Sequence, residues 1–269
     1  MFSFAFLLGL VLVVALTMRR NFLSHLDKLE AEIKSSSEPS FPRTDLPPVV
    51  MAYLARVGVG LQDVSKYVNF DQTGQMWSAP AGNPIDFTAK QIISTNETEF
   101  AWRAKAYFAR SVLVVDYFVK STGGLQVKLL GAVPLANMVG GDSIAKGEAL
   151  RFLAELPLNP DAIRFNNALE WTEIDSTSFK VAVGQGPARG VITFQLGEDG
   201  LIKTASAASR PYGTKAGSIT EYPWHGRFWD YQTLQGRKVP MQAEVAWGLE
   251  AGDFIYWRGK MLNWKAQSH

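Results

Sequence analysis

Three charged side chains lie at helical spacing in the segment SIAKGEALRFLAEL, residues 143–156. Glu148 and Arg151 are three residues apart and Arg151 and Glu155 are four apart, so all three project from one face of a helix. On a solvated face such ion pairs contribute only a few tenths of a kcal/mol each. If that face turns toward the concave side of a sheet, a desolvated arginine is able to hold a carboxylate or phosphate head group. Both interpretations stay open, and Phe152 joins the three as a candidate ligand-binding residue.

The C-terminal third of the chain is dense in aromatic residues. In chain order they are Tyr222, Trp224, Phe228, Trp229, Tyr231, Trp247, Phe254, Tyr256, Trp257 and Trp264. Such residues ordinarily pack in the core of a curved sheet. Trp and Tyr also supply amphipathic walls for acyl chains or rings, so Trp224, Trp247 and Trp257 are further candidates for an apolar ligand site.

His225 is the one ring base in a segment that we expect to be structured. An acid–base hydrolase that uses Glu155 or Glu244 with His225 is therefore an alternative, and it requires these side chains to converge in one cleft. No nucleophile is apparent, so no catalytic residue is assigned and an enzyme is not favoured. His225 and Glu244 are retained as candidates for ligand binding.

Composition narrows the chemistry further. The 269 residues include no Cys and three His, which excludes thiolate nucleophiles, zinc fingers and iron–sulfur clusters. We therefore expect no metal site and no cofactor. A net charge of +2 gives no strong steering toward phosphates, so a nucleic acid is not an expected partner. With 47% hydrophobic and 19% charged residues, the chain is typical of a folded protein.

The first residues predict a membrane anchor. Residues 2–18, FSFAFLLGLVLVVALTM, carry no charge and are followed at once by Arg19 and Arg20. As a helix they span about 25 Å, against a hydrocarbon core of about 30 Å. No basic residue precedes the run and no small-x-small site follows it, so an uncleaved single transmembrane helix over residues 1–20 is favoured over a cleaved signal. Arg19 and Arg20 slightly favour a cytoplasmic soluble domain.

Residues 21–44 are expected to connect this anchor to the rest of the chain. Phe22, Leu26, Leu29 and Ile33 lie at helical spacing, which predicts an amphipathic stalk that continues the anchor helix. The Ser- and Pro-rich residues 35–42 that follow are typical of a flexible tether.

Residues 45–269 predict one domain of α+β class. The pattern alternates with a period of two over most of this region, with Phe100, Trp102, Ala104, Ala106 and Phe108 on one face of a strand. We expect about ten strands with short connections, including a hairpin of 112–119 and 125–133, and thus an antiparallel meander. A short helix follows Pro48, and Pro157 and Pro160 end the helix of 143–156. The predicted fold is a curled antiparallel sheet, a half-barrel, packed on one or two helices.

Several segments together resemble an uncharacterised bacterial family, a domain of unknown function that usually follows an N-terminal membrane segment. They are Leu46-Pro47-Pro48, residues 128–134 (KLLGAVP), residues 147–155 (GEALRFLAE), Trp171, residues 223–226 (PWHG), residues 236–240 (GRKVP) and residues 256–260 (YWRGK). The resemblance covers nearly all of the soluble part and brings no activity with it. In architecture alone, the chain is distantly similar to the lipoprotein-carrier half-barrels.

The resulting prediction is a membrane-anchored protein that binds an apolar ligand, an acyl chain or a lipid, in the concave face of its sheet. The hydrolase is one alternative. A scaffold for another membrane protein is a second, and it requires Trp side chains exposed as an apolar patch.

Overall fold

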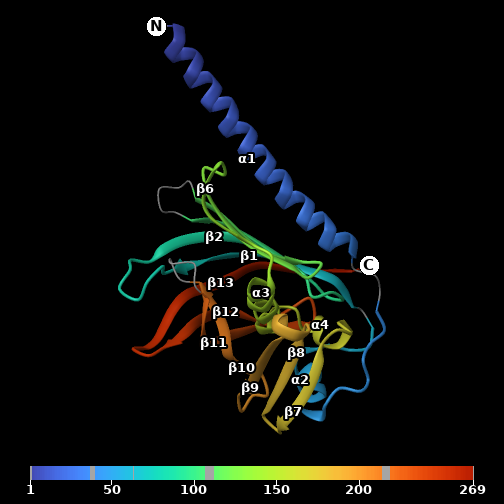
Figure 1. Cartoon of the computed structure of the whole chain (residues 1–269). Coiled ribbons are helices and arrows are strands. Elements are labelled where there is room, and N and C mark those ends of the chain that lie inside the picture. Colours follow the sequence, from blue (N-terminus) through green and yellow to red (C-terminus); the bar gives the residue numbers. More distant parts are fainter. Residues whose placement is uncertain (1, 37–39, 63, 107–111, 214–218, 269) are drawn as a thin grey trace.

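The computed structural model describes residues 2–36, 40–62, 64–106, 112–213 and 219–268, with the backbone alone for residues 2–9 and 36. These residues form one antiparallel sheet, which confirms the predicted curled sheet with few helices (Figure 1). Its thirteen strands lie in the order β6 (Val133–Val139), β5 (Thr122–Leu129), β4 (Val112–Val119), β3 (Phe100–Ala106), β2 (Ile85–Ser94), β1 (Ser65–Met76), β13 (Gly252–Ser268), β12 (Arg237–Leu249), β11 (Ile219–Leu234), β10 (Ile202–Gly213), β9 (Gly190–Leu196), β8 (Ser178–Val183) and β7 (Glu170–Asp175).

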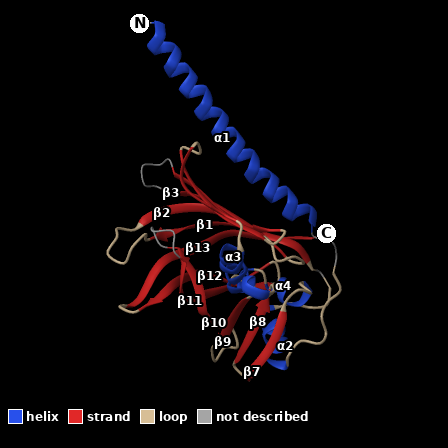
Figure 2. Ribbon diagram, in the orientation of Figure 1, coloured by secondary structure: helices blue, strands red, loops and turns tan. Residues whose placement is uncertain are grey.

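The strand order shows two meanders that meet at the middle of the sheet. Strands β1 to β6 run out to one edge, and β7 to β13 return from the other edge until β13 pairs with β1. The connection between the edges holds α3 (Asp142–Ala154), the 3-10 turn η1 (Leu156–Leu158) and α4 (Pro160–Phe165). This connection crosses the concave side, so α3 and α4 lie inside the curl of strands (Figure 2).

Helix α3 confirms the predicted amphipathic helix, although it ends at Ala154. Ala149, Phe152 and Leu153 are at most 2% exposed and form the apolar stripe expected from their spacing. Pro160 begins α4 at a position where its missing N–H costs no hydrogen bond. The sequence pattern did not predict α4, because six residues are too few to show a helical period.

The predicted hairpin of 112–119 and 125–133 is displaced in the structure. The first turn falls at Lys120 and Ser121, whose φ angles of 49° and 60° suit the two-residue turn of a twisted hairpin. A second turn follows at Leu130 and Gly131, with φ angles of 55° and 74°. Residues 130–132 therefore end β5, and β6 begins a new edge strand at Val133.

The main core fills the space between the concave face and the helices. Helix α2 (Pro48–Val57), predicted after Pro48, buries Tyr53 and Leu54 completely, and these pack in one cluster with Leu153, Phe179 and residues of β10 to β13. Part of the concave face is thus covered by the protein's own helices.

Helix α1 (Phe2–Ser36) continues without a break from the apolar run into the predicted stalk. The stalk residues Phe22, Leu26, Leu29 and Ile33 are 0–6% exposed, because they pack on the outer face of the sheet. Their partners on β2, β3 and β4 are Ile92, Ala101, Val115, Tyr117 and Val119. The second half of α1 is therefore fixed to the body, while the first half extends past the sheet edge near β6 (Figure 1).

Among the side chains that the structure describes, no helix is long and apolar enough to cross a membrane. The predicted single transmembrane helix includes residues 2–9, whose side chains lie outside that description, so it stays a prediction. Leu10, Val11, Leu12 and Val13 of this run are each more than half exposed.

The predicted flexible tether lies partly outside the described residues, which leave out 37–39. The part that is described contacts the domain. Ser40 Oγ donates to the Phe165 carbonyl oxygen, and the Arg43 amide donates to the Arg164 carbonyl oxygen at 3.0 Å. The chain is thus attached to α4 from residue 40 onward.

Candidate functional site

The charged triple of α3 faces the sheet and not the solvent. Arg151 Nε lies 3.0 Å from Glu155 Oε1, and Arg151 Nη1 pairs with Asp116 Oδ2 of β4. Gln91 of β2 donates from its amide to Glu155 Oε2. The four side chains join α3 to two strands that are remote in the sequence, and they form a polar cluster on the concave face.

Arg151 is enclosed by this cluster. Its guanidinium lies 4.9 Å from the centre of the Phe100 ring and 5.2 Å from that of Trp102, a cation–π arrangement. Burial disfavours the charge, but the neighbouring carboxylates of Glu155 and Asp116 outweigh it and raise the pKa of Arg151 further. Because both carboxylates already hold Arg151, it does not offer a free charge to a ligand.

Glu148, one turn before, is 7% exposed and lies beside Asp116. Burial, and then the negative charge of Asp116, raise the pKa of Glu148 well above its ordinary value. The buried atoms Glu148 Oε2 and Asp116 Oδ1 have no donor if both groups are ionised. A proton on Glu148 satisfies both atoms, because the carboxylic acid then donates to the Asp116 carboxylate.

The raised pKa of Glu148 predicts a stability that depends on pH. The folded state holds a proton that the unfolded state releases above about pH 4.3, so this contribution is complete at acidic pH and declines as the pH rises through the folded pKa. We expect Glu148→Gln, neutral at every pH, to flatten the decline of the free energy of unfolding as the pH rises from the unfolded pKa through the folded one. Urea unfolding measured across this range tests it. Glu170→Gln, an exposed control, is expected to leave the slope unchanged, and an equal slope for Glu148→Gln contradicts the assignment.

A row of aromatic rings lines the concave face beside the polar cluster. The rings form two groups. Within each group, neighbouring rings are stacked or edge-on, with their centres 4.9 to 5.8 Å apart. One group holds Tyr222, Tyr212, Trp247 and Tyr256, and the other holds Trp257, Phe87 and Trp102. Tyr256 and Trp257 are neighbours at a β-bulge opposite Val245 and Ala246, and Trp224 Nε1 donates to the Tyr256 hydroxyl at 2.9 Å. We call these eight residues, with Trp224 included, the aromatic wall.

Arg210 of β10 is a functional candidate that the sequence pattern missed. Its guanidinium lies 5.0 Å from the Trp224 ring centre and 5.5 Å from that of Trp247, and Nη1 is 3.4 Å from the Tyr256 hydroxyl oxygen. Among the described residues, no carboxylate lies within 4.0 Å of it. Arg210 is therefore a half-buried cation on the aromatic wall without an ion-pair partner.

Beyond α3, the concave face continues as an apolar surface of its own. This apolar lining consists of Phe87, Ala89, Trp102, Ala104 and Val114, with the half-buried Met76, Val112, Leu125, Val127 and Trp257 packed around them. It forms a cluster separate from the main core. The half-buried members are those that a ligand is able to reach.

Two of the predicted ligand-binding residues are corrected by the structure. Glu244 lies on the outer face between Arg227 and Arg258, with its Oε2 2.7 Å from Arg258 Nη2. His225 Nε2 is 3.1 Å from the exposed Asp253 carboxylate. The reason is the alternation of side chains along a strand, because Trp224 and Trp247 point inward and their neighbours of opposite parity point outward.

The alternatives lose their geometric basis as a result. Glu155 lies on the concave face and Glu244 on the outer one, so the two carboxylates do not converge in one cleft. On the outer face, Glu244 pairs with Arg227 and Arg258, while His225 pairs with Asp253. A scaffold role required exposed Trp side chains, but Trp224 and Trp247 are 3% and 7% exposed. Phe152, at 1% exposed, is a core residue and not a lining one. Trp224, Trp247 and Trp257 do lie on the concave face, and their role in binding stays a prediction.

Two surface depressions in the described structure lie outside the concave face. One, of about 380 Å³, follows α1 from Leu16 to Asp27, and the other, of about 320 Å³, lies between α1 and β1, β2 and β13. No group of three or more His, Asp or Glu residues suited to a metal ion is found in the described part of the chain.

The fold and the site define a class of protein, an antiparallel half-barrel curled over a crossing helix with an aromatic concave face. Residues 39–259 match the model described as "Family of unknown function (DUF6544)", and the chain belongs to this family. This confirms the expected membership of an uncharacterised family. A comparison with curated proteins gives no match.

The chain is also similar to solved structures. A DUF1329 family protein from Desulfovibrio piger is 9% identical with a TM-score of 0.45, over 81% of this chain and 90% of that one. A LolA superfamily protein from Nitrosomonas europaea is 10% identical with a TM-score of 0.44, over 82% of this chain and 94% of that one.

Proposed function

We propose that this protein is a membrane-associated half-barrel that binds an amphipathic ligand, an acyl chain with an anionic head group, on its concave face. The observation that carries the proposal is Arg210, a cation on a wall of aromatic rings with no carboxylate of the described residues within 4.0 Å. The rest of the site follows from what surrounds this side chain.

Arg210 suits an anionic head group for three reasons. Its guanidinium is partly desolvated by Trp224 and Trp247, which strengthens a charge-assisted bond to a carboxylate or phosphate. The Tyr256 hydroxyl lies within reach of the same ligand atoms. Glu148, the nearby acid of α3, interacts with the charge of Arg210, but burial and Asp116 raise the pKa of Glu148, which favours its neutral form.

The apolar lining suits the chain of such a ligand. Trp257 belongs both to the aromatic wall, where it stacks on Phe87 at 5.8 Å, and to the apolar lining, together with Leu125 and Val127. Each buried methylene contributes about 0.8 kcal/mol, so a chain laid along this surface supplies much of the affinity. The helices already cover part of the concave face. The apolar lining is the part that they leave uncovered, and it is therefore the place for the ligand.

Membrane attachment is the second part of the proposal. Residues 2–18 are uncharged and the described side chains among them are mostly exposed, which is unfavourable in water. A bilayer would cover them, with Arg19 and Arg20 at the interface and, by the positive-inside rule, the half-barrel on the cytoplasmic side.

A head-group substitution tests the site. The full chain, purified in a zwitterionic detergent, is incubated with oleate, and bound oleate is counted by native mass spectrometry. Arg210→Gln is expected to weaken oleate binding by roughly 10- to 100-fold, because it removes a charge-assisted hydrogen bond. Arg227→Gln, on the neighbouring strand β11 but on the outer face, serves as the matched control. Equal binding by the two variants, or none by the unaltered protein, rejects the proposal.

A substitution in the apolar lining tests the chain-binding part independently. Val127→Glu places a charge on the concave face, and Gln126→Glu places the same charge one residue earlier on the outer face, where Gln126 contacts Asn137. We expect only Val127→Glu to abolish oleate binding, since a carboxylate against an acyl chain is costly. If both variants lose oleate binding, or if neither does, the acyl chain does not lie on the apolar lining.

A further inference from the structure

The point where α1 leaves the sheet brings three elements together. Arg19 Nη1 donates to the Leu130 carbonyl oxygen at 3.4 Å, and Gly131 lies against the Arg19 side chain. Gly131 also lies against Leu113 of β4. The turn between β5 and β6 is therefore held beside the first charged residues of α1.

Cations gather at this junction. In the sheet register Leu113 is directly opposite Lys105 on one side and Lys128 on the other, so both lysines share the outer face with it. Lys128 Nζ lies 4.3 Å from the centre of the Phe22 ring on α1. Burial, together with the positive charges of Lys128 and Lys28, lowers the pKa of His25, as expected where cations are crowded.

Exposed apolar side chains border the same cations. Leu130, Val133 and Leu135, on the turn and the edge strand β6, are 53%, 52% and 58% exposed. In Figure 1, β6 lies below the apolar first half of α1. Leu130 is thus held beside Arg19, directly after the exposed apolar residues Leu16 and Met18 of α1.

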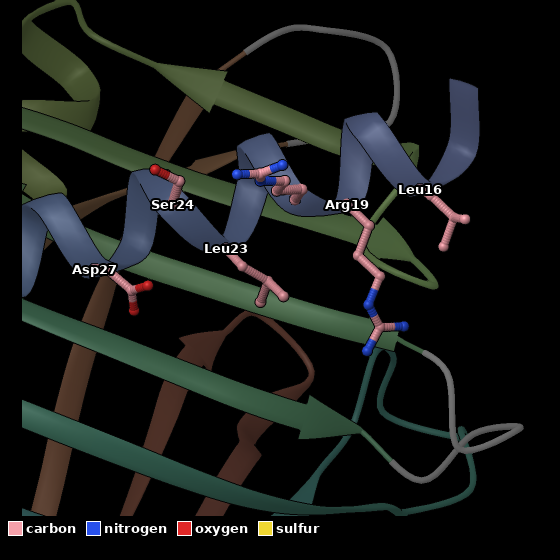
Figure 3. A pocket seen from close by; sticks show the side chains of 6 residues that line it. Leu16, Arg19, Leu23, Ser24 and Asp27 are labelled. Atoms are coloured by element: carbon pink, nitrogen blue, oxygen red, sulfur yellow. The ribbon is translucent and has the colours of Figure 1, made fainter. Parts of the chain in front are cut away.

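A depression marks the boundary between the apolar and charged parts of α1. Leu16, Arg19, Arg20, Leu23, Ser24 and Asp27 line it, with a volume of about 380 Å³. Figure 3 shows Leu16, Arg19, Leu23 and Asp27 projecting from one side of the helix. Arg103 of β3 pairs with Glu30 at 3.1 Å and lies 3.9 Å from Asp27, so the acidic residues at this end of the depression have a cationic neighbour on the sheet.

We propose that this junction is a docking surface for anionic phospholipid. The bilayer-facing surface consists of Arg19, Arg20, Lys105 and Lys128 as cations, with Leu130 and Leu135 as apolar contacts. It rests on the proposed membrane attachment and adds the lipid class and the orientation. Since the second half of α1 is buried on the sheet, the helix cannot pivot, and the β5–β6 edge meets the head groups whenever residues 2–18 enter the bilayer.

Vesicle binding tests the lipid class. The full chain is mixed with vesicles of phosphatidylcholine, or of phosphatidylcholine with 30% phosphatidylglycerol, and bound protein is measured by flotation. We expect tighter binding to the anionic vesicles, which added salt reduces. A variant carrying Arg19→Gln, Arg20→Gln and Lys105→Gln is expected to lose on the order of 100-fold in binding to anionic vesicles, at about fivefold per charge. A control with Arg56→Gln, Lys180→Gln and Lys238→Gln, on α2, β8 and β12, is expected to retain the preference.

The absence of cysteine permits a test of orientation. Leu135→Cys and Ile174→Cys each place one thiol on an exposed residue of an opposite edge strand, β6 or β7, for labelling with a polarity-sensitive fluorophore. On adding anionic vesicles, we expect a blue shift and brighter emission from position 135 alone.

The outcomes separate the two proposals. If the unaltered chain binds neither kind of vesicle, the proposed attachment through residues 2–18 is wrong, and the proposed docking surface is refuted as well. If it binds both vesicles equally, or if positions 135 and 174 respond alike, the attachment stands and the docking surface is refuted.

Discussion

Arg151→Met is expected to lower the free energy of unfolding by about 3–5 kcal/mol. The substitution removes the cation that lies between Asp116 and Glu155, whose side chains are only 14% and 19% exposed. Both carboxylates then remain in the concave face without a counter-charge, and burying an unpaired charge is costly. Urea unfolding at neutral pH, followed by tryptophan fluorescence, measures the loss.

Two further variants make this result specific. Arg189→Met breaks an exposed pair with Glu170, and we expect it to cost less than about 1 kcal/mol. Combining Arg151→Met with Asp116→Asn and Glu155→Gln removes the unpaired charges and should recover much of the stability. A loss below about 1 kcal/mol for Arg151→Met, or no recovery in the combined variant, contradicts the role of the ion cluster.

Asp161→Ala is expected to have an effect of similar size, about 3–5 kcal/mol. Asp161 of α4 is 2% exposed, and its Oδ1 lies 2.5 Å from Nε of Arg237 on β12. Its Oδ2 accepts from both the amide and the hydroxyl of Ser65 on β1, each at 2.9 Å. One carboxylate thus joins the crossing connection to strands from both meanders, and its removal takes the counter-charge from Arg237 and the acceptor from Ser65.

The measurement is again urea unfolding, with Lys203→Met as the control. Lys203 pairs with Asp199 at the surface, so its loss is expected to cost less than about 1 kcal/mol. Asp161→Asn retains an acceptor for Ser65 while it removes the charge, so it should fall between Asp161→Ala and the unaltered protein. If Asp161→Ala is no more damaging than Lys203→Met, the joining role is wrong.

Local patterns were reliable where one face of an element is apolar. The spacing of Ala149, Phe152 and Leu153 fixed the buried side of α3, and alternation placed Trp102 and Ala104 together on the concave face. The same alternation places Glu244 on the face opposite to Trp247, as the structure has it.

Strands β1 and β2 show why alternation also failed. Their inward positions include Gln72 and Gln91, which a period-two pattern counts as solvent-facing. Trp102 Nε1 donates to Gln72 at 2.6 Å, and Gln91 donates to Glu155 of α3. These partners are at least thirty residues away in the chain, so no local window reveals that the glutamines are buried.

By itself, the sequence determined the antiparallel class, the apolar stripe of α3 and the shared face of its charged triple, because each depends on the short-range geometry of helix and strand. Only the tertiary structure decided that the predicted stalk packs on the sheet, that Arg151 is already paired, and that Arg210 has no ion-pair partner among the described residues. Pairing depends on which strands are adjacent, and in this sheet the first strand and the last strand lie side by side. Contacts between such distant segments follow from the whole topology and not from the spacing of neighbouring residues.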